Sequence, residues 1–178
     1  MSEPSEPNDP SDANDPNDPS DWRHRVDAVW AQAETLGHDG VIRRIDAIAD
    51  ERPGDDPVAL FERAGARDSA GLEAQAELLY RSAIASGLSG SERVQAHIQL
   101  ASTVRNLGRP LEAIALLQAI EPEAGELRDA VAAFRALALV DAGDGRQAAS
   151  VALAALAPHL MRYRVSVAAY AAELAASA

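Results

Sequence analysis

The chain contains no cysteine and no lysine, so all 16 of its basic residues are arginine. The absence of cysteine excludes disulfide bonds and thiolate metal sites. No apolar run reaches the roughly 18 residues that a membrane-spanning helix needs. The amino terminus also lacks the basic start and apolar segment of a secretory signal. We therefore expect a cytoplasmic protein that has no membrane partner.

Basic residues are also outnumbered, since the chain has 28 acidic and 16 basic residues and a formal net charge of −12. This excess argues against a nucleic-acid partner, which needs a basic surface. Seven of the acidic residues recur at every third position of residues 1–21, in proline-rich triplets such as Asn14-Asp15-Pro16. Such a segment has too little apolar surface to offset its ordering entropy, so we expect a disordered acidic tail. Two interpretations of the tail stay open: a solubilising segment, and a tether for a basic partner.

From residue 22 onward the apolar residues follow helical spacing, and no alternating strand pattern occurs. The most informative pattern is a glycine followed five residues later by an alanine, which occurs at Gly71, Gly108 and Gly143. Glycine ends a helix, and alanine lets the next helix pack closely against it. These glycines are 37 and 35 residues apart, which is typical of repeated helix pairs. The pattern predicts an all-α fold, a right-handed α-solenoid of antiparallel helix pairs within a single domain over 22–178.

Proline and glycine positions define the units of this solenoid. Asp56 before Pro57 predicts a helix start, and Pro158 predicts a break. The predicted units are an amino-terminal cap pair over 22–52, repeats over 57–87, 91–121 and 126–157, and a capping helix over 159–176. We expect the first cap helix to end at Gly37 and Gly40. We expect the last helix to be amphipathic, with an apolar face made of Leu160, Tyr163, Val167, Tyr170 and Leu174.

Leu100–Arg109 fits the tetratricopeptide repeat consensus, with His97 in the tryptophan position and Val104 in the tyrosine position. The chain also resembles the group 5 subfamily of bacterial tetratricopeptide repeat proteins over about residues 53–157. The segments that carry this resemblance are residues 60–64, 68–71, 73–81, 87–88, 100–109 and 133–139. The resemblance implies a non-catalytic protein-interaction module, and a homodimer.

In solenoids of this kind the first helix of each pair lines the concave face, which is therefore the candidate site for a protein or peptide partner. The candidate binding residues there are Phe61, Gln95, Ile98, Gln99, Ser102, Arg105, Asn106 and Leu137. Arg105 and Asn106 have the chemistry to hold a peptide backbone or a carboxylate. The alternative is that both residues are solvated or cap the turn before Gly108. The carboxylate clamp known in other tetratricopeptide proteins uses lysines, which this chain lacks.

Catalytic and metal-binding patterns are missing. The four histidines are scattered without metal-ligand spacing, and there is no phosphate loop or nucleophile elbow. We therefore expect no enzyme activity, no metal and no cofactor.

Two functional hypotheses remain. The first is a scaffold that binds a protein segment in its concave groove. The second is a self-associating structural protein, with contacts through the aromatic residues Trp22, Trp30, Tyr163 and Tyr170.

Overall fold

The computed structural model describes residues 19–176, and their secondary structure is entirely helical and irregular. The predicted tail over 1–21 lies outside the described residues, except for its last three positions, which begin the first helix. The helices are α1 (Pro19–Ala31), α2 (Ala33–Ala49), α3 (Pro57–Asp68), α4 (Glu73–Ala85), α5 (Gly90–Asn106), α6 (Pro110–Ile120), α7 (Arg128–Asp141), α8 (Gly145–Leu156) and α9 (Arg164–Ala176). The predicted all-α class is confirmed.

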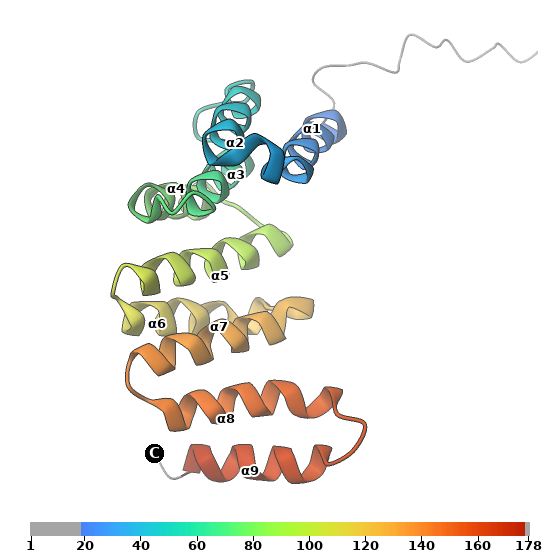
Figure 1. The fold of residues 1–178 in the computed structure, drawn as a ribbon, viewed down its shortest axis with the longest axis vertical. Coiled ribbons are helices and arrows are strands. Elements are labelled where there is room, and N and C mark those ends of the chain that lie inside the picture. The colour runs from blue at the N-terminus through green and yellow to red at the C-terminus, as the bar shows by residue number, and fades with distance from the viewer. Residues whose placement is uncertain (1–18, 177–178) are drawn as a thin grey trace, which may run out of the picture.

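Consecutive helices pack against each other along the whole chain, as a solenoid requires. The hairpins α3/α4, α5/α6 and α7/α8 follow one another down the long axis, and α9 lies at the lower end of the stack (Figure 1). The first helices of the three pairs also contact one another, α3 with α5 and α5 with α7. These first helices therefore line one side of the molecule in common.

Each hairpin turn is built in the same way. Gly71, Gly108 and Gly143 have φ values of 70°, 81° and 85°, a left-handed conformation that favours glycine. The residue after each glycine donates its backbone N–H to the carbonyl five residues earlier, at 2.9, 3.1 and 2.9 Å. These bonds satisfy carbonyls at the helix end. The alanines five residues beyond, Ala76, Ala113 and Ala148, are all buried, which confirms the role of the glycine-to-alanine step.

The first helix of the amino-terminal pair ends earlier than predicted. The chain turns at Gln32, so that α1 ends at Ala31, and Gly37 forms a kink inside α2 with a φ of 63°. The apolar spacing runs on through the turn because Ala33 and Leu36 pack on the same core cluster as α1. Hydrophobic periodicity alone therefore hid the turn at Gln32. The predicted break at Gly37 is present as a non-helical residue inside α2, whereas the helix continues through Gly40.

Trp22 belongs to the core of this helix pair. Its side chain is 4% exposed, and its indole Nε1 donates to the carbonyl oxygen of Ile48 at 2.9 Å. The guanidinium of Arg52 lies 3.9 Å from the centre of the indole ring, in the arrangement of a cation–π pair. Trp22 is therefore not a surface contact residue for self-association, contrary to the expectation from sequence.

The last helix is shorter than predicted, and only part of its predicted apolar face is packed: Val167 and Leu174 are half-buried, whereas Tyr163 and Tyr170 are exposed. α9 begins at Arg164, after a turn in which Tyr163 adopts a φ of 66°. Ala171 is buried against α8, where the Ser150 hydroxyl donates to its carbonyl oxygen at 2.7 Å. Tyr163 and Tyr170 are 75% and 60% exposed. The small Ala171 allows close approach to α8, so the two tyrosines are left outside the packed stripe.

Candidate functional site

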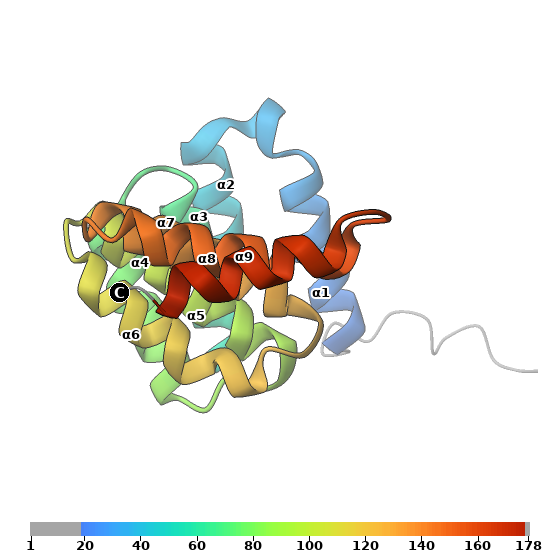
Figure 2. The ribbon, with the colours of Figure 1, turned by 90° about the horizontal axis from the view of Figure 1, so that it is seen from below.

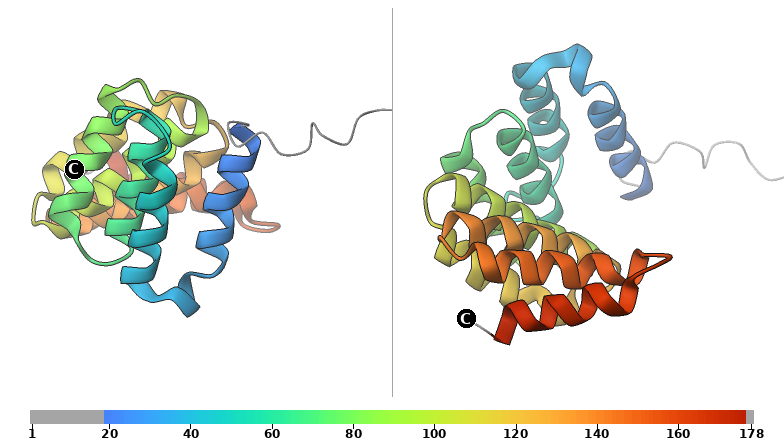
Figure 3. Two further views of the ribbon diagram at one scale, coloured as in Figure 1. Left: turned by 90° about the horizontal axis from the view of Figure 1, so that it is seen from above. Right: turned by 60° about the horizontal axis from the view of Figure 1, so that its bottom comes forward.

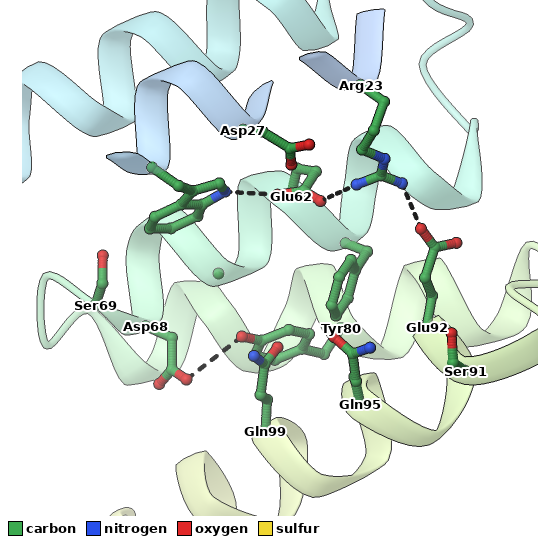
Figure 4. Close-up of a pocket in the computed structure, with 13 residues that line it drawn as sticks. Arg23, Asp27, Glu62, Asp68, Ser69, Tyr80, Ser91, Glu92, Gln95 and Gln99 are labelled. Carbon is green, nitrogen blue, oxygen red and sulfur yellow. Dashed lines mark hydrogen bonds and ion pairs between the residues drawn. The ribbon is translucent and has the colours of Figure 1, made fainter. Parts of the chain in front are cut away.

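A cavity of about 650 Å³ opens between α1, α3 and α5, with Tyr80 of α4 at its base (Figure 4). Its lining residues are Arg23, Asp27, Trp30, Phe61, Glu62, Gly65, Asp68, Ser69, Tyr80, Ser91, Glu92, Gln95 and Gln99. Residues of the first helices α3 and α5 line the cavity, and residues of α1 form one wall of it. Figure 3 shows α1, in blue, beside the amino-terminal end of the stack of helices. We call it the α1/α3/α5 pocket. Its volume is within the ordinary range for a binding cleft.

Arg23 of α1 fixes one end of the pocket. Its guanidinium pairs with Glu62 of α3, Nη1 to Oε1 at 2.6 Å, and also with Glu92 of α5. The other carboxylate oxygen of Glu62 accepts a bond from the Trp30 indole at 2.8 Å. Glu62 is only 6% exposed, and a buried carboxylate needs such partners. These bonds therefore hold α1 against the first two repeats.

Asp68 lies at the other end of the pocket (Figure 4). The Tyr80 hydroxyl donates to Oδ2 at 3.3 Å, and the Thr103 hydroxyl lies 3.1 Å from Oδ1. Within residues 19–176, no arginine or histidine forms an ion pair with this carboxylate. Burial raises the pKa of Asp68 above its ordinary value, against the lowering effect of the two hydroxyl bonds. Burial also raises the pKa of Tyr80, and the charge of Asp68 adds to that effect.

Gln99 contributes a second acceptor to the pocket. Its Oε1 atom is buried and has no hydrogen-bond partner among the described residues. Its side chain projects toward the Tyr80 ring, beside Gln95 (Figure 4). Since a buried carbonyl oxygen without a partner is unfavourable, this end of the pocket favours a hydrogen-bond donor.

Aromatic rings supply the apolar part of the pocket. Trp30, Phe61 and Tyr80 all line it, and the rings of Phe61 and Tyr80 lie 6.2 Å apart in a tilted arrangement. Gly65 of α3 lies beside them. A Cβ atom there would be 3.4 Å from Cζ2 of Trp30 and 3.9 Å from the hydroxyl oxygen of Tyr80. The missing side chain at this position therefore leaves space between the two rings.

The pocket is acidic. Its ionisable lining residues are four carboxylates and Arg23, which sum to a formal charge of −3. Arg23 is already shared between two of the carboxylates. The electrostatics thus favour a cationic group over an anionic one.

The structure separates the residues predicted from the sequence into three groups. Phe61, Gln95 and Gln99 line the α1/α3/α5 pocket together. Ile98 is 6% exposed and belongs to the main core. The others (Ser102, Arg105, Asn106 and Leu137) lie outside this pocket.

The guanidinium of Arg105 already has protein partners. Its Nε lies 3.4 Å from Oδ2 of Asp141, and its Nη2 donates to Oδ1 of Asn106 at 3.1 Å. Ser102 is half-buried, whereas Leu137 of α7 is 47% exposed. These contacts are the partners that the structure gives Arg105 within residues 19–176.

Several pocket residues were not predicted as binding residues, among them Arg23, Asp27 and Trp30 of α1. These residues are three to four positions apart, so they share one helical face, but the sequence does not distinguish a binding face from a solvated or core face. Only the packing of α1 beside α3 and α5 brings them to the concave side. Residues 19–176 contain no group of side chains suited to hold a metal ion. No helix within them is long and apolar enough to cross a membrane.

The fold and its glycine turns define an α-solenoid of helix hairpins, with a pocket on the face lined by the first helices. The family model for the tetratricopeptide repeat matches residues 57–174, which span most of the chain. The chain therefore belongs to the tetratricopeptide repeat family. Neither a curated protein nor a solved structure matches it significantly. Proteins of this family are generally non-catalytic modules for protein interaction.

Proposed function

We propose that this protein is a non-catalytic interaction module that binds an extended segment of a partner protein along its concave face. The observation that carries the proposal is the α1/α3/α5 pocket, which is open and holds two acceptors without adequate partners. A folded protein normally satisfies buried polar groups internally. Asp68 receives only hydroxyl donors, and Gln99 Oε1 has no partner among the described residues, so both acceptors favour a further donor from a ligand.

Two exposed apolar residues of the first helix α7 support this function. Leu137 and Val140 of the inner helix α7 are 47% and 57% exposed. They are three positions apart, so they lie on one helical face. A segment in the groove would bury these side chains while one residue enters the pocket. Interfaces of this small size, below about 1,200 Å², are commonly of micromolar affinity.

The test is selection of random peptides displayed on phage against the full chain. The selected peptides are then measured by fluorescence anisotropy against Leu137→Glu and Leu111→Glu. Leu111 is 73% exposed on α6, a second helix of its pair, so it is the matched control. We expect Leu137→Glu to weaken binding about tenfold and Leu111→Glu to leave it unchanged. A failure to select any peptide, or equal loss in the two variants, would contradict the function.

Self-association is a second candidate function, and the surface of α9 favours it. α9 packs mainly on α8, and Val165 and Tyr170 stay 79% and 60% exposed. Seen from below, no other helix covers the outer side of α9 (Figure 2). Exposed apolar side chains at the end of a solenoid favour contact with another molecule.

Sedimentation over about a hundredfold range of concentration tests this, because the mass of a self-associating protein rises with concentration. Val165→Glu should abolish that rise. Leu78→Glu, at a 68% exposed position on α4, should not. A constant monomer mass for the unmodified chain would exclude this second function.

A further inference from the structure

The chemistry of the α1/α3/α5 pocket indicates which side chain of a partner enters it. Asp68 is a half-buried carboxylate that receives only hydroxyl donors, from Tyr80 and Thr103. A carboxylate removed from water is most strongly stabilised by a cationic donor. That requirement is unmet among the described residues.

A second acceptor, independent of charge, lies in the same pocket. The Oε1 atom of Gln99 is buried and unpaired, and it projects toward the ring of Tyr80, whose hydroxyl is bonded to Asp68 (Figure 4). Because Asp68 and Gln99 are two acceptors that line one pocket, they favour a ligand that carries several N–H groups. Guanidinium and ammonium groups have several donors and no acceptor.

The walls also suit a long cationic side chain. Trp30 and Phe61 offer aromatic surface for an aliphatic stem or for a cation above the ring. Gly65 leaves the space between Trp30 and Tyr80 open. The chain already holds one guanidinium in this way at the opposite end, where Arg23 lies between Glu62 and Glu92.

We propose that the pocket receives an arginine or lysine side chain of the bound partner segment, with the Asp68 carboxylate and the Gln99 amide oxygen as its acceptors. This inference rests on the proposed function, since it names the chemistry of the segment that the concave face binds. It reverses the polarity of a lysine-built carboxylate clamp: here the receptor is acidic and the ligand is basic.

The peptides selected on the full chain provide the first readout. We expect arginine or lysine to be enriched at one position relative to the unselected library. The tightest peptide is then compared with its counterpart in which citrulline replaces arginine, or norleucine replaces lysine. These neutral analogues keep the length of the side chain, so that charge is the main change. Binding should weaken about tenfold or more, which corresponds to about 1.4 kcal/mol.

Variants of the protein locate the effect in the pocket. Asp68→Asn should weaken the cationic peptide about tenfold and should abolish the difference between it and the neutral analogue. Asp39→Asn is the matched control, because it removes the same charge from an exposed position on α2 and leaves the pocket intact. Gln99→Met removes the second acceptor while it keeps the side-chain length, and should weaken the cationic peptide several-fold. Thermal melting followed by circular dichroism verifies that each variant is folded.

The outcomes separate this inference from the function on which it rests. Peptides that bind and respond to Leu137→Glu, but show no enrichment of basic residues, would overturn the cationic pocket and leave the interaction module standing. Equal binding of the charged and neutral peptides to the unmodified chain would overturn it too. Equal weakening by Asp68→Asn and Asp39→Asn would show long-range attraction to an acidic protein and overturn the site. Binding of arginine amide alone, with peptides excluded, would assign the pocket to a small molecule and overturn the protein partner.

Discussion

Gly65→Ala should make the protein more stable and its pocket smaller. Gly65 lies in the ninth position of the 12-residue helix α3, where glycine is less favourable than alanine by about 1 kcal/mol. The added Cβ would lie 3.4 and 3.7 Å from two ring atoms of Trp30 and 3.9 Å from the Tyr80 hydroxyl oxygen. These are ordinary van der Waals separations, so strain does not offset the gain in helix propensity.

The expected gain is therefore about 1 kcal/mol in the free energy of unfolding, or a rise of about 2–4 °C in Tm for a domain of this size. Urea unfolding followed by circular dichroism measures the first quantity, and thermal melting the second. The same methyl group enters the space between Trp30 and Tyr80, so the peptides selected on the unmodified chain should bind several-fold more weakly. Stability and binding should thus change in opposite directions.

Gly40→Ala is the contrasting variant. Gly40 also lies within a helix, but a Cβ there would be 3.0 Å from the Cβ of Leu36. At that separation the backbone of α2 has to shift, and we expect no gain in Tm or a decrease. A lower Tm for Gly65→Ala, or the same response in both variants, would refute the placement of Trp30 beside Gly65.

Three further predictions concern the carboxylates and the hairpin packing. Because the pKa of Asp68 is raised, its carboxyl group stays protonated to higher pH in the folded state than in the unfolded chain, and the stability that protonated Asp68 contributes is lost as pH rises through the folded pKa. The stability of Asp68→Asn relative to the unmodified protein should therefore increase from about pH 3 to pH 7. A stability difference that does not change with pH across that range would contradict this. Hydrogen bonding to Arg109, and then to Arg81, lowers the pKa of Glu77, so Glu77→Gln should cost about 1 kcal/mol at neutral pH and almost nothing at about pH 3; a pH-independent loss in urea unfolding would show another cause. Ala113 is fully buried between α5 and α6, and Ala113→Leu should lower the stability by about 1–3 kcal/mol; an unchanged Tm would show that this hairpin is not tightly packed.

The hairpins could be predicted from the sequence because their determinants are local. A left-handed glycine ends one helix, and a small residue five positions later admits the next, so Gly108 and Ala113 are sufficient to locate α5 and α6. The turn at Gln32 has no such glycine, and the apolar spacing continues across it from α1 into α2. The boundary there depends on packing, which a pattern of residue types does not record.

The pocket was predictable only in part, for a related reason. Phe61, Gln95 and Gln99 follow from their position on first helices. Arg23 and Trp30 reach the pocket because the buried Glu62 binds both of them, and this is a contact between segments more than 30 residues apart in the sequence. Tyr80 is fully buried in the core, yet its hydroxyl also reaches Asp68.

The two tryptophans give the molecule an optical property. Both lie on α1, and the chain has no others. Trp22 is enclosed in the core, whereas Trp30 borders the pocket and is bonded to Glu62. The emission of Trp22 is thus a constant background, while that of Trp30 changes when a ligand displaces water beside its ring. A Trp30→Phe chain supplies the blank, so occupancy of the pocket can be followed in the intact protein without any attached dye.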